Sequence, residues 1–103
     1  MPFPEKRNHR IPLSAAAAMT RRFRDGAKGA VQGHMFPREV IESLLNQPGA
    51  YGIRFYLGTG DDGATGLVAV AVDSDANDMS NGEVFDFGFP CPPWCGGGSA
   101  LNT

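Results

Sequence analysis

The sequence predicts a small α+β domain, in which two helices cover one side of an antiparallel sheet of about three strands. Two segments, one before Gly26 and one after Pro37, carry apolar residues at helical spacing. Two further apolar segments are joined by a glycine-rich turn, which is typical of a β-hairpin. The chain has 103 residues, with 14 glycines and 8 prolines. We therefore expect one thin core and many turns.

The first helix is expected over about residues 15–25, in the stretch AAAAMTRRFRD. Ser14 is its expected N-cap and Gly26 its stop. A second helix should begin near Pro37 and end before Pro48, because proline suits a first helical turn and Pro-Gly ends a helix. Its apolar stripe, which we expect in the core, consists of Val40, Ile41, Leu44 and Leu45.

Three strands are expected after the second helix. The first, YGIRFYL at residues 51–57, should bury the alternate side chains Tyr51, Ile53, Phe55 and Leu57. The turn GTGDDGATG connects it to LVAVAVD, which is apolar on both faces and should be the central strand. The segment EVFDFGF then predicts a third strand that places Phe85, Phe87 and Phe89 on one face.

The ends of the chain predict a simple domain organisation. Residues 1–13 contain three prolines and should form an extended arm. Residues 14–95 are expected to form a single α+β domain, in which GAKGAVQGH is a loop. Residues 96–103, GGGSALNT, should form a flexible tail.

Charge and hydropathy argue against two classes of partner. The formal net charge is −2, which argues against nucleic-acid binding because phosphate affinity depends on clustered Lys and Arg. The longest apolar stretch, residues 66–72, is far too short to span a membrane. The basic and alanine-rich start is better explained by a helix than by a secretion signal. We therefore expect a cytoplasmic protein with reduced thiols.

Three sequence blocks, LLNQPGAYGIRFYLG, LVAVAVDSDANDM and CPPWC, together cover much of residues 14–95. In this combination the chain resembles a family of short uncharacterised bacterial proteins with an IRxY strand, a VDxxxND turn and a C-terminal CPPxC. The resemblance implies a bacterial intracellular origin and attaches no activity. In that family a glycine often occupies the position of Ala76.

The Asp-rich segment after the second strand has two interpretations. Its oxygen-bearing side chains fall at the first, third, fifth and ninth positions of a calcium loop: Asp73, Asp75, Asn77 and Asn81. The sixth position is Asp78 instead of glycine, and the twelfth is Val84 instead of glutamate. Asp and Asn also cap β-turns through side-chain hydrogen bonds, so a structural turn is favoured and weak cation binding is the alternative.

The cysteines of CPPWC, Cys91 and Cys95, are separated by three residues, which differs from the two-residue spacing of dithiol redox enzymes. One possibility is a packed turn with unpaired thiols and a buried Trp94. A second is a zinc site completed by His9 and His34, and a third is a disulfide closing a short loop. The sequence leaves all three open.

Arg54 and Tyr56 share the polar face of the first strand and, with Trp94, are candidate interaction residues. The simpler expectation is a salt bridge from Arg54 to Glu83 or Asp86 on a neighbouring strand. No general acid, general base and nucleophile occur at a recognisable spacing, which disfavours an enzyme.

A sheet of this size leaves edges and one face to protect, which favours association between copies. The charge distribution also favours it, because every basic residue except Arg54 lies at or before Arg38 and nine of the eleven acidic residues follow it. We therefore expect a non-enzymatic self-assembling structural or interaction protein without a cofactor, in which arm and tail contact other copies; a filament is one form that such an assembly can take. The alternative is a small zinc-binding module that uses the CPPWC cysteines.

Overall fold

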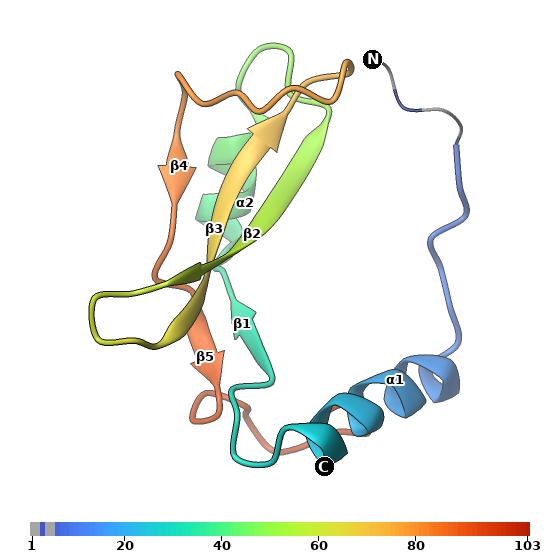
Figure 1. Ribbon diagram of the computed structural model, residues 1–103. Helices are drawn as coiled ribbons and strands as arrows, with labels where there is room; N and C mark the ends of the chain where they lie inside the picture. The colour runs from blue at the N-terminus through green and yellow to red at the C-terminus, as the bar shows by residue number, and fades with distance from the viewer. Residues whose placement is uncertain (1–2, 4–5) are drawn as a thin grey trace. The chain divides into compact units, whose positions relative to one another are not determined.

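The structure is a computed structural model that describes residue 3 and residues 6–103 (Figure 1). Residues 1, 2, 4 and 5 of the predicted arm lie outside the described part. The described residues form two helices and five strands in two antiparallel sheets, which confirms the α+β class. Contacts between residues gather in two compact units. Unit 1 comprises Met1–Lys6 and Phe36–Gly88, and unit 2 comprises Arg7–Met35 and Phe89–Thr103.

Unit 1 contains helix α2 (Arg38–Leu45) and a sheet of three strands, β2 (Gly52–Thr59), β3 (Thr65–Val72) and β4 (Val84–Phe85), in the order β2-β3-β4. The predicted hairpin is confirmed, because β2 and β3 pair antiparallel from Gly52↔Val72 to Thr59↔Thr65. The central position of β3 is confirmed as well. Its last four residues are all buried, as expected for a strand with neighbours on both sides.

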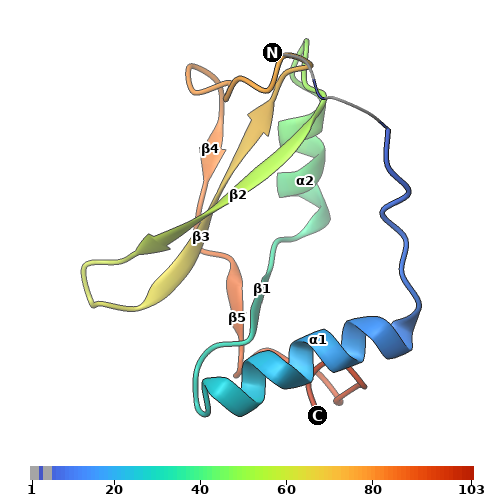
Figure 2. The same ribbon diagram turned by 45° about the vertical axis from the view of Figure 1, so that its right-hand side comes forward.

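The core of unit 1 lies between α2 and one face of the sheet (Figure 2). Leu44 is fully buried and packs with Ala69 and Ala71 of β3, whose small side chains let the helix approach the strand closely. Partly buried side chains surround these three residues: Phe36, Val40, Ala50, Ile53, Met79 and Phe85. Leu45, which we expected in the core, is 45% exposed.

The predicted buried face of β2 is only partly correct. Ile53 packs against the core, whereas Tyr51, Phe55 and Leu57 are exposed, Leu57 by 80%. The reason is length. An eight-residue helix is about 12 Å long, whereas an eight-residue strand is about 26 Å long. Helix α2 therefore covers the end of the hairpin near Ile53 and leaves the other end uncovered.

The third strand predicted beside the second is confirmed as β4, but it does not extend over all of EVFDFGF. Phe87 has a φ of 60°, which is not compatible with a continuous strand, and it divides the segment in two. Residues Val84–Phe85 form β4 beside β3, whereas Phe89–Cys91 form β5 and pair with β1 (Gly33–Met35). Strand β1 lies in the segment that we expected to be a loop. It has three residues, too few for a periodic pattern to reveal it.

Unit 2 contains helix α1 (Leu13–Gly26) together with β1 and β5. The helix begins earlier than expected, and Ser14 is not its N-cap. Pro12 holds that position without a side-chain hydrogen bond, and its carbonyl accepts from the N–H groups of Ala15 and Ala16. Proline has an extended ψ of 151° here and fixes φ at −68°, so the chain enters the helix without a polar cap.

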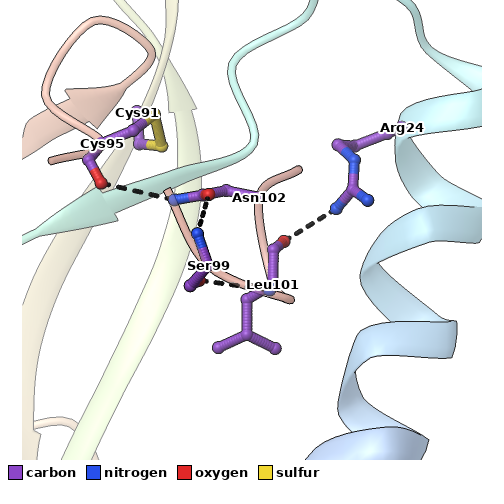
Figure 3. The surroundings of a disulfide bond; sticks show 6 residues. All are labelled: Arg24, Cys91, Cys95, Ser99, Leu101 and Asn102. Carbon is purple, nitrogen blue, oxygen red and sulfur yellow. Dashed lines mark hydrogen bonds between the residues drawn. A yellow bond between two sulfur atoms is a disulfide. The ribbon is translucent and has the colours of Figure 1, made fainter. Parts of the chain in front are cut away.

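The C-terminal segment is folded in the structure, which corrects the expectation of a flexible tail. Ser99 N–H donates to Asn102 Oδ1 at 2.8 Å, and the Thr103 hydroxyl donates to the Ser99 carbonyl at 2.6 Å. Asn102 Nδ2 donates to the Cys95 carbonyl at 3.3 Å, and Arg24 of α1 donates to the Leu101 carbonyl at 2.7 Å (Figure 3). The tail is therefore held by its own unit.

Candidate interaction surfaces

Strand β2 forms one edge of the unit 1 sheet. It pairs with β3 on one side, and in the described part of the chain no strand pairs with its other side. Eight residues are long for an edge strand, and a free edge presents unpaired backbone N–H and C=O groups. The chain segment GIRFYLGT contains neither Lys nor Pro, two residues that commonly blunt such edges.

Exposed apolar and aromatic side chains lie along this edge. Phe55 is 46% exposed, Tyr56 45% and Leu57 80%. Tyr51, just before the strand, stacks on Phe3 of the arm with ring centroids 5.3 Å apart. Because aromatic side chains are enriched in protein interfaces, the edge combines backbone pairing capacity with interface-type side chains.

The opposite face of the sheet from α2 carries a cluster of Arg54, Tyr56 and Asp78. Arg54 donates to Asp78 Oδ1 at 2.6 Å and to the Ala76 carbonyl at 3.3 Å, and the Tyr56 hydroxyl donates to Asp78 Oδ2. The predicted partners of Arg54, Glu83 and Asp86, are therefore wrong. Asp78 is brought there because it forms a β-bridge with Val72 at the end of β3.

The same contacts shift the pKa values of the two charged side chains in the cluster. The hydrogen bond from Tyr56, followed by that from Arg54, lowers the pKa of Asp78 because both stabilise the carboxylate. The hydrogen bond with Asp78 raises the pKa of Arg54. Both charges are therefore satisfied inside the cluster, which makes it a stabilising feature of the sheet and leaves little of either charge for a ligand.

The Asp-rich segment forms a turn with its own hydrogen bonds. Asp73 Oδ1 accepts from the backbone N–H groups of Asp75 and Asn77, at 2.9 and 3.0 Å. The bond from Asn77 is the main reason that the pKa of Asp73 is lowered. Ala76 closes the turn with a φ of 69°, a conformation that favours glycine. These contacts agree with the structural turn that the sequence favours over weak cation binding.

Cys91 and Cys95 are joined by a disulfide, so the expectation of reduced thiols is wrong for this structure. The bond closes a turn in which Trp94 N–H donates to the Pro90 carbonyl at 2.9 Å. Trp94 is 62% exposed and meets Phe89 edge-on, with ring centroids 5.6 Å apart. The expected burial of its ring against a sheet is therefore also wrong, although Trp94 does contact strand β5.

The proposed zinc ligands Cys91, Cys95, His9 and His34 are all in unit 2. His34 lies in β1 opposite Pro90, and His9 is exposed in the arm. Both sulfurs are used by the disulfide, so zinc binding through them would require the reduced form. Across the described residues, no group of three or more His, Cys, Asp and Glu side chains is placed to hold a metal ion.

The chain matches no protein-family model, and neither a curated protein nor a solved structure is similar to it. Among the described residues, neither helix is long and apolar enough to cross a membrane. The functional proposal therefore depends on the surfaces of the chain itself.

Two residues of these surfaces were missed by the sequence reasoning. The calcium-loop pattern treats Asp78 only as a residue in place of glycine, although an acidic residue six positions after a central strand can fold back beside it. The alternation of EVFDFGF places Phe87 on one face with Phe85 and Phe89, yet Phe87 is 92% exposed. The glycine that follows it, Gly88, was the available signal that the strand ends there.

Proposed function

We propose that this chain is a non-enzymatic, self-associating structural or interaction protein, and that β2 of one copy pairs with β2 of a second copy. The observation that carries the proposal is the open edge of β2 with its exposed Phe55, Tyr56 and Leu57. An exposed, long and apolar edge strand is a template for pairing with another chain.

The electrostatics of the edge favour pairing between identical strands. Arg54 is the only charged residue of β2, and Asp78 of the same chain neutralises it. Two copies of β2 therefore bring together no uncompensated like charges, which would oppose pairing. The aromatic side chains beside the edge would supply apolar contact area once the backbone bonds have formed.

A pair of identical strands that run antiparallel is related by a two-fold axis, so the interface would be isologous. The two three-stranded sheets would then form one continuous sheet across both copies. Each β2 would become an interior strand, and the unpaired backbone groups on its outer side would be satisfied.

Analytical ultracentrifugation over a dilution series tests the proposal with Leu57→Lys. Lysine is one of the residues that block edge pairing, and it enters a two-fold interface twice. We expect the dissociation constant to rise by about tenfold or more, a change of roughly 1.4 kcal/mol or more. The variant should therefore be monomeric at concentrations at which the unaltered chain assembles. Leu57 is 80% exposed, so circular dichroism should show an unchanged fold.

Leu13→Lys is the matched control, because Leu13 is also exposed, by 60%, but belongs to α1 in unit 2. This variant should assemble like the unaltered chain. The proposal fails if the unaltered chain is monomeric throughout the series, or if Leu57→Lys assembles equally well.

A further inference from the structure

Phe87 is the most exposed large apolar side chain of the described residues, at 92%. It lies between Phe85, which packs on the unit 1 core, and Phe89, which contacts Trp94 in unit 2. Its φ of 60° is rare for a bulky residue. Strained backbone of this kind occurs preferentially at functional sites. Contact with another molecule would remove this exposed phenyl ring from water.

An apolar hollow of suitable size exists in unit 2. It has a volume of about 250 Å³ and is lined by Met19, Thr20 and Phe23 of α1, together with Gln32 and Leu101. A cavity of about 150 Å³ is enough to hold a benzene molecule. The hollow therefore has room for one phenyl ring, and the Met19 thioether and Phe23 ring offer favourable contacts to it.

One residue that lines the hollow, Gln32, has an unsatisfied polar atom. Gln32 Oε1 is buried, and no described residue donates a hydrogen bond to it. A buried acceptor without a donor is unfavourable. Because that oxygen is itself buried, the fit of the hollow to an entering side chain depends on the apolar groups that line it.

The charges around the two elements are complementary. Asp86 precedes Phe87 directly and Glu83 lies four residues before it, and both are exposed. Arg22 is exposed on α1 one turn after Met19, and so lies next to the hollow, whereas Arg21 is on the other side of the helix. Asp25 is the only acidic residue of α1, so the helix stays net basic.

We propose that Phe87 of one copy inserts into the hollow formed by α1, Gln32 and Leu101 of another copy. The contact joins different surfaces of the two copies and is therefore heterologous, which extends an assembly into a chain or a ring. The inference rests on the proposed self-association and adds a second contact to it. One side chain is a small interface, so the contact is weak alone and becomes effective when β2 pairing presents it twice.

Two variants test the inference by ultracentrifugation and electron microscopy. Phe87→Ala removes the inserted ring, and Met19→Glu places a carboxylate at the hollow, where it repels Asp86. We expect both variants to stop at the two-fold dimer under conditions in which the unaltered chain forms longer assemblies. The controls are Val84→Ala and Met35→Glu, at residues that are 51% and 52% exposed and do not line the hollow, and both should retain the longer assemblies.

Mixing the variants separates this contact from β2 pairing. In a Leu57→Lys background, isotope-labelled Phe87→Ala protein keeps the hollow, and unlabelled Met19→Glu protein keeps the phenylalanine. Titration should shift the amide resonances of residues 19–23 in the labelled protein. The same titration with a partner that carries both Phe87→Ala and Met19→Glu should not.

The outcomes distinguish the two proposals. If Phe87→Ala forms assemblies as long as those of the unaltered chain, or the titration shifts nothing, the inference is overturned while β2 pairing stands. If the titration succeeds but Leu57→Lys does not weaken association, the heterologous contact stands and β2 pairing fails.

Discussion

Arg54 of β2 reaches Asp78 across the central strand β3, with 2.6 Å between the guanidinium nitrogen and carboxylate Oδ1. Arg54 is opposite Val70 in the sheet register, and Asp78 is opposite Val72. The ion pair therefore lies over these two valines, which are 4% and 3% exposed. The sheet face opposite α2 is thus covered at this end by a polar bridge.

Asp78 should make the stability of unit 1 depend on acid pH. Its folded pKa is lowered, chiefly by the Tyr56 hydroxyl, so its contribution is present above the ordinary Asp pKa of about 3.9. That contribution is lost as the pH falls through the lower folded value. Urea denaturation followed by circular dichroism between pH 7 and strongly acidic pH should show a smaller acid loss for Asp78→Asn. Part of the acid loss of stability should remain in this variant, because the pKa of Asp73 is also lowered in the folded chain.

Tyr56→Phe provides a finer version of the same experiment. Without the hydroxyl, the folded pKa of Asp78 should rise towards its unfolded value, so the acid loss of stability should be smaller and should be complete at a higher pH than in the unaltered chain. Tyr51→Phe removes a hydroxyl from an exposed tyrosine that stacks on Phe3, and should leave the profile unchanged. Identical profiles for Tyr56→Phe and the unaltered chain would argue against the hydrogen bond.

Leu44 and Leu45 allow a direct comparison of burial on one helix. Leu44 is fully buried against Ala69 and Ala71, whereas Leu45 is 45% exposed. We expect Leu44→Ala to lower the free energy of unfolding by about 2–5 kcal/mol through lost burial and a cavity. Leu45→Ala should cost less than about 1 kcal/mol. Equal losses in urea denaturation would contradict the position of α2.

Local patterns predicted the fold wherever an element is long and periodic. The β2–β3 hairpin and the central position of β3 followed from alternation, a glycine-rich turn and an apolar strand. The exposure of Leu57 could not be predicted in this way. Alternation identifies one face of a strand, but it does not show how far a helix extends over that face. Leu45 was misassigned for the same reason, since a helical stripe does not give its own width.

The short elements depend on contacts that sequence patterns do not encode. Strand β1 exists because β5 supplies its partner groups, and β5 begins only after Phe87 has turned the backbone. The candidate site was predicted in part: Arg54, Tyr56 and Asp73 take part in the hydrogen bonds of unit 1. Asp78 could not be paired with Arg54 in advance, because their proximity arises from a bridge at the end of β3.

Ala76→Gly should stabilise the turn after β3. Ala76 has a φ of 69°, in the left-handed region that disfavours residues with a Cβ by about 1–2 kcal/mol. Glycine loses about 0.5–1 kcal/mol more in chain entropy, so the net gain should be about 0.5–1 kcal/mol. Ala64→Gly, in the hairpin turn where φ is not positive, should instead lower stability by a similar amount. A loss for Ala76→Gly would contradict the left-handed conformation.

The Cys91–Cys95 disulfide should stabilise unit 2 by about 2 kcal/mol, since it closes a short loop and constrains the unfolded chain little. Thiol quantitation of the denatured protein, purified without reductant, should find no free thiol. The double variant Cys91→Ser with Cys95→Ser should increase hydrogen exchange at Gln32, whose N–H donates to the Cys91 carbonyl at 2.7 Å.

Reductant provides the control for this prediction. It should increase exchange at Gln32 in the unaltered chain and have no effect on the double variant, because only the unaltered chain has a bond to reduce. Exchange in β3 of unit 1 should stay the same in every sample. Two free thiols per chain would contradict the disulfide and restore the expectation of a reduced, cytoplasmic protein. A disulfide in protein trapped by alkylation inside cells would favour an oxidising compartment instead.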